Sequence, residues 1–306
     1  MTGAVVGALV PVALLIALGA GIRRAAFLRD AFWPQAERLG YYVLLPSLFL
    51  HSLATARLAG VPVAGLAGAL AVSTVATAAA LVAARRWVGG ADASFTSVFQ
   101  GGVRFNSYVG VAVASGLLGP PGVALAAVAV AAIVPTVNVL CVLVFARYGA
   151  GAQFTARGVG RQLVGNPLLA ACAAGVALQA SGVGLPPGVE PVLRALGAAS
   201  LPLGLLCVGA ALEARAAQEW ARPVAVASAF KFVVMPVAAA AACRVLGVDG
   251  AAAVTAVLFQ ALPTAPSGYI LARQLGGDAP LMAGITAAQT VLAGVAVPVA
   301  LLLLAG

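Results

Sequence analysis

The chain has 306 residues, of which 63% are hydrophobic and only 8% are charged, with 17 basic and 8 acidic side chains. A soluble domain carries about 25% charged residues, so this composition excludes a cytosolic enzyme, a nucleic-acid-binding protein and a disordered chain. The net charge is +9, but basic residues in so apolar a chain are more typical of membrane topology than of nucleic acid binding.

Apolar stretches long enough to cross a bilayer follow one another along the chain. About 20 apolar residues span the hydrocarbon core, and their backbone groups must be paired within a helix or a closed barrel. Long apolar runs without period-2 alternation favour helices, so the fold class is predicted to be an all-α polytopic membrane protein. Divided at charges, Gly/Pro clusters and polar stretches, the sequence predicts ten transmembrane helices, at 4–22, 33–56, 62–84, 97–118, 123–146, 164–181, 189–212, 222–246, 251–272 and 279–304.

The basic residues predict the orientation of these helices. If the N-terminus is outside, the inner connections hold twelve basic residues and the outer ones hold only three, Arg57, Arg194 and Arg244. This is the positive-inside pattern, so we expect both termini outside. Sixteen of the basic residues are arginine, which is typical of a GC-rich bacterial genome. We therefore expect a multi-pass protein of the bacterial cytoplasmic (inner) membrane.

Matching residues in chain order indicate an internal repeat. Pro11 and Pro167 are 156 residues apart, as are Pro46 and Pro202. At slightly larger offsets, the fourth predicted helix carries Asn106-Ser107-Tyr108 and the ninth carries Pro266-Ser267-Gly268-Tyr269. The fifth and tenth carry matching prolines, Pro135 and Pro298. Five helices per half is an odd number, so the second half is inverted. The predicted repeats are 1–150 and 151–306, as in secondary transporters.

The fourth and ninth predicted helices carry signals of interruption. In the ninth, Pro263-Thr264-Ala265-Pro266-Ser267 has two prolines that remove backbone donors and clash with preceding carbonyls. The fourth has no proline, and its break depends on Gly101-Gly102 and on Asn106-Ser107. Paired interruptions in the two halves of a transporter point to the substrate site. The alternative is a structural kink in a packed helix.

Two cations lie inside predicted spans, although buried charge is costly and usually functional or paired. One hypothesis is that Arg104 and Lys231 attract an anion to the transport region. The alternative is that they reach the membrane surface or bind carbonyl groups and fix helix geometry. No carboxylate lies deep in a span, and the four cysteines are scattered without a CxxC pair, so we expect no metal, no cofactor and no enzyme activity.

Three further polar residues are candidates for a substrate site. Asn138 follows Pro135 by one turn, and it is equally compatible with facing substrate and with packing. Ser47 and the only histidine, His51, lie in the second predicted helix. A lone histidine near the end of a span is more typical of an interfacial or packing residue than of a proton carrier.

Five segments in chain order resemble the auxin efflux carrier family, whose plant members are the PIN auxin exporters and whose bacterial members are described as carriers of malonate or malate. The resemblance covers nearly the whole chain, and the order of the segments is more specific than any one of them. The segments are Tyr41–Pro46, Arg104–Gly110, Asn166-Pro167-Leu168, Lys231 with Met235-Pro236, and Pro263–Ser267.

The resemblance implies an elevator transporter in which interrupted helices 4 and 9 cross. A scaffold of 1–60 and 164–215 would dimerise, and a transport domain of 61–150 and 216–306 would move. By position, Asn106 and the 263–267 stretch would lie at the crossing. Asn138, with Ser47 or His51, would line a pocket for a small carboxylate. Two departures from the plant members are the missing proline in helix 4, which predicts a softer break, and the short 147–163 connection, which is typical of a bacterial member.

The predicted function is a secondary transporter of small organic anions, such as malonate, malate or an auxin-like monocarboxylate, by alternating access. Its expected partners are the carboxylate, the lipid bilayer and a second copy of the chain, with no nucleic acid. The predicted substrate-binding residues are Arg104, Asn106, Ser107, Asn138, Pro263, Thr264, Pro266, Ser267, Ser47, His51 and Lys231. The alternatives are a sodium-coupled symporter of the bile-acid symporter type and a membrane sensor that does not transport.

Overall fold

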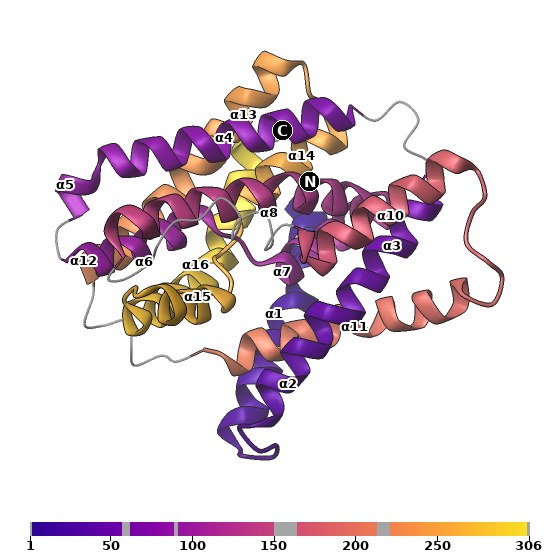
Figure 1. Ribbon diagram of the computed structural model, residues 1–306, viewed down its shortest axis with the longest axis horizontal. Coiled ribbons are helices and arrows are strands. Elements are labelled where there is room, and N and C mark those ends of the chain that lie inside the picture. Colours follow the sequence, from indigo (N-terminus) through magenta and orange to yellow (C-terminus); the bar gives the residue numbers. More distant parts are fainter. Residues whose placement is uncertain (1, 57–61, 89–90, 150–163, 213–220, 305–306) are drawn as a thin grey trace. The chain divides into compact units, whose positions relative to one another are not determined.

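The computed structural model describes residues 2–56, 62–88, 91–149, 164–212 and 221–304, and every regular element within these ranges is a helix. Contacts divide the chain into two compact units (Figure 1). Unit 1 contains Met1–Val63, Ser107–Ala131 and Arg161–Ala211, and unit 2 contains Ala64–Asn106, Ala132–Gly160 and Leu212–Gly306. Each unit is therefore assembled from segments far apart in the sequence.

Unit 1 consists of long apolar helices that pack through small residues. Its elements are α1 (Thr2–Arg24), α2 (Phe32–Leu39), the π-helical turn η1 (Gly40–Leu44), α3 (Leu45–Thr55), α7 (Ser107–Leu118), the first part of α8 (Pro120–Tyr148), α10 (Pro167–Ser181) and α11 (Glu190–Ala210). Helix α10 begins with a strong local signal, because the Asn166 side chain accepts from the backbone N–H groups of Leu168 and Leu169 and Pro167 follows at the first helical position.

Glycines bring the helices of unit 1 close together. A Cβ atom at Gly19 of α1 would collide with the backbone of Leu206 in α11, and one at Gly209 of α11 would collide with the backbone of Ile16 in α1. Helices α3 and α10 lie side by side (Figure 1), and a Cβ atom at Gly175 of α10 would lie 2.8 Å from Leu53 Cβ. Small residues at such contacts are typical of helices that associate within a membrane, because dispersion contacts require close backbones.

Unit 2 contains the remaining helices. Its elements are α4 (Val63–Ala83), α5 (Arg85–Val88), α6 (Asp92–Val103), the last part of α8, α12 (Ala221–Ala229), the π-helical turn η3 (Phe230–Val234), α13 (Met235–Leu246), α14 (Gly250–Gln260), α15 (Ser267–Leu275) and α16 (Ala279–Leu304). Asp278 joins the starts of α6 and α16, because it accepts from the hydroxyls of Ser94 and Ser97 and from the N–H of Leu281.

Two π-helical turns precede prolines. Turn η1 ends two residues before Pro46, and η3 ends two residues before Pro236. Because proline has no N–H and its ring displaces the preceding turn, a wider turn ahead of it keeps the helix continuous without a sharp break. The predicted helix at 33–56 is thus α2–η1–α3, and the one at 222–246 is α12–η3–α13.

Six helices among the described residues are long and apolar enough to cross a membrane, and all six fall on predicted spans. They are Gly7–Arg24, Val63–Ala83, Pro120–Tyr148, Glu190–Ala210, Ala221–Leu246 and Ala279–Leu304. Shorter apolar helices occupy Pro167–Ser181 and Gly250–Gln260. The ten-helix inverted repeat and the orientation stay predictions. Four of the basic residues, Arg57, Arg157, Arg161 and Arg215, lie outside the described residues, as does the boundary between the predicted repeats.

Candidate functional site

The helix is interrupted at both places that carry a sequence signal. Helix α6 ends at Val103, Arg104 is extended with φ −75° and ψ 161°, and α7 begins at Ser107. Helix α14 ends at Gln260 and α15 begins at Ser267, with residues 261–266 between them. Gly101 and Gly102 lie inside α6, so the first interruption consists of residues 104–106 and does not include the glycine pair.

The two interruptions meet within unit 2. The backbone N–H of Asn106 donates to the carbonyl oxygen of Pro263 at 2.8 Å. Asn106 and Thr264 are almost fully buried. A broken helix leaves backbone donors and acceptors that must find partners away from water. Here a backbone donor of the first interruption pairs with a backbone acceptor of the second.

Gln289 of α16 connects the second interruption to the last turn of α6, just before the first interruption. Its Oε1 accepts from the backbone N–H of Thr264 at 3.0 Å, and its Nε2 donates to the carbonyl oxygen of Gly101 at 3.0 Å. The side chain is fully buried. One amide therefore satisfies a donor of the second interruption and an acceptor in the last turn of α6. The sequence prediction did not include Gln289 among the site residues, although an uncharged amide in an otherwise apolar span is the signal that could have found it.

Two more buried polar side chains lie close to the interruptions. Among the residues that the structure describes, the Thr264 hydroxyl and both amide atoms of Gln100 have no hydrogen-bond partner, and neither residue is exposed. The backbone carbonyl of Gln100 accepts from the N–H of Arg104 at 2.8 Å, which places Gln100 one turn before the break. An unpaired buried polar atom costs free energy, so these two side chains mark where a polar guest would find hydrogen-bonding capacity. Gln100 was also missing from the sequence prediction.

Arg104 and Asn138 come together beside the first interruption. The guanidinium Nη1 of Arg104 donates to Asn138 Oδ1 of α8 at 3.4 Å, and both side chains are half-buried. None of the ion pairs found within the described ranges includes Arg104. The interruption thus carries a positive charge that no carboxylate in that part of the chain neutralises.

Lys231 has a different environment. It is fully buried in η3, and its Nζ donates to the thioether sulfur of Met235, one turn further along the same helix, at 3.3 Å. The hydrogen bond that the structure gives it is therefore internal to its helix and reaches neither interruption. A substrate contact for Lys231 stays a prediction.

Three of the predicted site residues belong to unit 1. The Ser47 hydroxyl donates to the carbonyl of Val43 in its own helix at 2.7 Å. His51 Nε2 lies 3.7 Å from Glu190 Oε1 of α11, and the histidine is half-buried. Ser107 is the first residue of α7. In unit 2, Pro266 precedes α15 and Ser267 begins it.

The residues around the two interruptions form a cluster that offers neutral amides, backbone groups and one guanidinium. Its members are Gln100, Arg104, Asn106, Asn138, Pro263, Thr264 and Gln289. Within the described ranges, no group of three or more His, Cys, Asp or Glu residues is placed to hold a metal ion. The four cysteines are buried free thiols. The arrangement offers hydrogen bonds and a positive charge to a bound molecule.

Comparisons with known proteins bear on the second half of the chain. Residues 152–301 match the model of a family described as membrane transport protein. This segment includes α14, the second interruption with Pro263 and Thr264, α15, and most of α16 with Gln289. A comparison with curated proteins finds no match for the chain.

Proposed function

We propose that this chain is a secondary transporter that moves small organic anions across a membrane by alternating access. The observation that carries the proposal is the meeting of two interrupted helices through Asn106 and Pro263, with Gln289 bonded to both. Transporters form substrate sites from discontinuous helices, because a helix break exposes oriented backbone groups to a bound molecule. The membrane-transport family match over 152–301 supports the same class.

The charge at the first interruption favours an anionic substrate. Arg104 is half-buried and its guanidinium is held by Asn138 Oδ1. A guanidinium presents several donors in one plane and binds a carboxylate through two parallel hydrogen bonds. Asn138 orients the group without neutralising it, so the positive charge remains available to malonate, malate or a monocarboxylate.

The mechanism that we propose is an elevator in the bacterial cytoplasmic membrane. Residues 61–150 and 216–306 would form the moving transport domain. Residues 1–60 and 164–215 would form a dimerising scaffold, and both termini would lie outside. Contacts such as that between Gly19 and Leu206 support a rigid scaffold, because closely packed helices resist deformation.

The test is uptake of labelled malonate and malate by purified protein in liposomes. We expect Arg104→Gln to raise the KM about tenfold or more, since a charged hydrogen bond contributes roughly 1.5–3 kcal/mol. Asn138→Ala is expected to have a smaller effect of the same kind, because it removes the group that orients Arg104. Arg147→Gln is the matched control, since Arg147 is an exposed residue at the end of the same helix as Asn138.

Full-rate uptake by folded Arg104→Gln for every transported substrate would remove Arg104 from the site. The same assay with sodium replaced by choline tests the sodium-coupled alternative, which requires uptake to fall. Tight carboxylate binding without any uptake would favour a sensor and contradict a transporter.

A further inference from the structure

The ends of two apolar helices meet in unit 2 at a cluster of arginine and tryptophan. Helix α5 (Arg85–Val88) follows α4 after one residue, and it packs against α12, which begins at Ala221. Helix α4 and the continuous helix Ala221–Leu246 are both candidate membrane spans. The side chains at this end therefore lie where the hydrocarbon core gives way to lipid headgroups.

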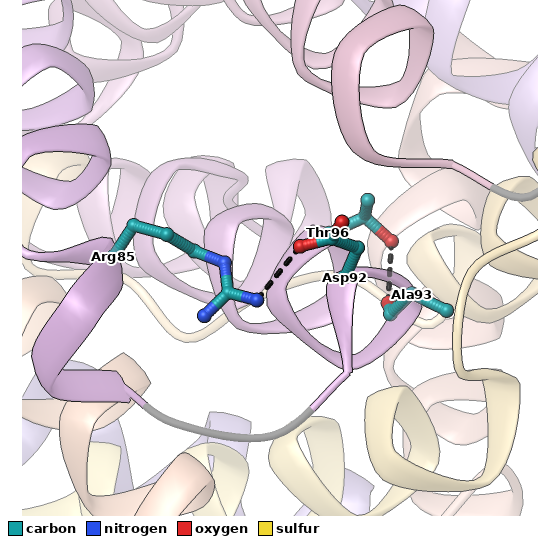
Figure 2. Close-up of polar contacts among 4 residues, drawn as sticks. All are labelled: Arg85, Asp92, Ala93 and Thr96. Carbon is teal, nitrogen blue, oxygen red and sulfur yellow. Dashed lines mark hydrogen bonds and ion pairs between the residues drawn. The ribbon is translucent and has the colours of Figure 1, made fainter.

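The first arginine of the cluster is already neutralised. Arg85 Nη2 lies 2.7 Å from Asp92 Oδ1, and its guanidinium lies over the ring of Phe95 at 5.1 Å from the centroid. Figure 2 shows Arg85 extending to Asp92, beside the first turn of α6 where the Thr96 hydroxyl donates to the Ala93 carbonyl. The charge of Arg85 is therefore paired within the protein, and its side chain connects α5 to α6.

The next two arginines remain available. Arg86 is exposed, and its Cζ lies 4.8 Å from the centroid of the Trp87 ring. Arg222 of α12 is also exposed, and its Nη2 donates to the backbone carbonyl of Trp87 at 2.7 Å. Neither arginine belongs to an ion pair within the described ranges. Two guanidinium groups without an ion pair in the described part of the chain therefore contact a single tryptophan, one at its ring and one at its backbone.

The tryptophan places this charge at a membrane surface. Trp87 is 62% exposed. Exposed tryptophan at the end of a span is typical of the headgroup level, because the indole has an apolar ring and a polar N–H. Arginine binds phosphate groups through its planar fork of donors, and basic residues near a membrane are attracted to anionic lipids.

We propose that Arg86, Trp87 and Arg222 form a binding site for the phosphate headgroup of an anionic phospholipid. The two guanidinium groups bind the phosphate, and the indole lies against the glycerol and upper acyl region of the same lipid. A zwitterionic lipid is held less well, because its own ammonium group offsets the charge that the arginines recognise. This site lies outside the two interruptions, residues 104–106 and 261–266, and does not depend on which molecule the chain transports.

The test measures lipid retained by purified protein after delipidation and incubation with phosphatidylglycerol or phosphatidylcholine, by native mass spectrometry. We expect the double variant Arg86→Gln/Arg222→Gln to retain at least threefold less phosphatidylglycerol than the unmodified chain, with phosphatidylcholine unchanged. Arg244→Gln is the matched control, because Arg244 is an exposed arginine in the last turn of α13, at the opposite end of the same span. Arg86→Lys/Arg222→Lys, which keeps the charge and loses the fork, should retain an intermediate amount.

Three results would overturn the proposal. The first is equal phosphatidylglycerol retention by the unmodified chain and a double variant whose circular dichroism shows the same helix content. The second is an equal loss in Arg244→Gln, which would indicate a general charge effect. The third is thermal stabilisation by inorganic phosphate as large as that by phosphatidylglycerol, which would assign the site to a soluble anion. A failed uptake assay leaves lipid retention intact, so this inference and the transport proposal fail separately.

Discussion

The two interruptions in unit 2 are built in different ways. Residues 261–266 include Pro263 and Pro266, which cannot donate backbone hydrogen bonds, so the chain itself prevents a continuous helix there. Residues 104–106 contain no proline, and nothing covalent stops α6 from continuing into α7. Their non-helical backbone is held by a tertiary bond, from Asn106 N–H to the Pro263 carbonyl. One break is thus encoded locally, whereas the other depends on its partner.

Because only one of the two breaks is encoded by prolines, we expect the residues that contact them to contribute unequally to stability. Gln289 is bonded to Thr264 in the second interruption and to Gly101 in the last turn of α6. Since the break at 104–106 has no proline of its own, we expect it to depend on Gln289 more than the break with two prolines does. If the comparison is right, removing tertiary partners should affect function and stability more than removing a proline does.

The largest effect is expected from Gln289→Leu. The substitution preserves approximate volume but leaves the Thr264 N–H and the Gly101 carbonyl buried without partners, at roughly 1–3 kcal/mol each. We expect a loss of about 2–5 kcal/mol in stability, a clearly lowered melting temperature in detergent, and severely reduced uptake. Gln179→Leu is the matched control, since Gln179 is half-buried near the end of α10 and its side chain connects no helices in the described part of the chain. A melting temperature no lower than that of the control would show that Gln289 does not hold the cluster.

A smaller loss is expected from Gln260→Leu, immediately before the proline-containing break. Gln260 Nε2 lies 2.8–3.0 Å from the Leu70 carbonyl and from the hydroxyls of Ser73 and Thr74, all in α4. Because both hydroxyls keep their own hydrogen bonds to the Leu70 carbonyl when the amide is gone, we expect the free energy of unfolding to fall by only about 1–3 kcal/mol. An unchanged melting temperature would mean that prolines alone position the end of α14.

Gly101→Ala tests the close packing that lets Gln289 reach its acceptor. The added Cβ would lie 2.6 Å from Ile285 Cγ2 of α16 and 3.2 Å from Ala227 Cβ of α12, so Ile285 must move, and we expect α16 to shift with it. Overpacking of this kind costs about 1–3 kcal/mol, and the shift lengthens the Gln289 bond to Gly101. The control is Gly294→Ala in α16. The added Cβ meets no atom within 4 Å, so this variant should leave stability unchanged or raise it slightly. Equal melting temperatures for the two variants would contradict the packing argument.

Sequence patterns predicted those parts of the structure that are encoded locally. The apolar runs placed the six candidate spans, and the prolines placed the interruption at 261–266 because proline acts on its own helix. The bridge formed by Gln289 could not be predicted, because an amide side chain identifies its partners only after three segments have come together. The contact of Lys231 is of a different kind, because its Nζ donates to the Met235 sulfur four residues further along the same helix. The roles of Arg104 and Asn138 in binding stay predictions, although their contact is present.

The smallest effect is expected from Pro266→Ala, the variant that most directly tests the break encoded by proline. Pro266 already has helical backbone angles, φ −56° and ψ −28°, so alanine fits without strain and gains only flexibility in the unfolded chain. We expect the free energy of unfolding to fall by about 1 kcal/mol or less. Hydrogen exchange of the segment that begins α15 should change little. The break should persist, because Pro263 remains and Thr264 N–H stays bonded to Gln289. A loss as large as that of Gln289→Leu would reverse the comparison, since it would mean that the prolines hold both interruptions and that the glutamine only fills space between them.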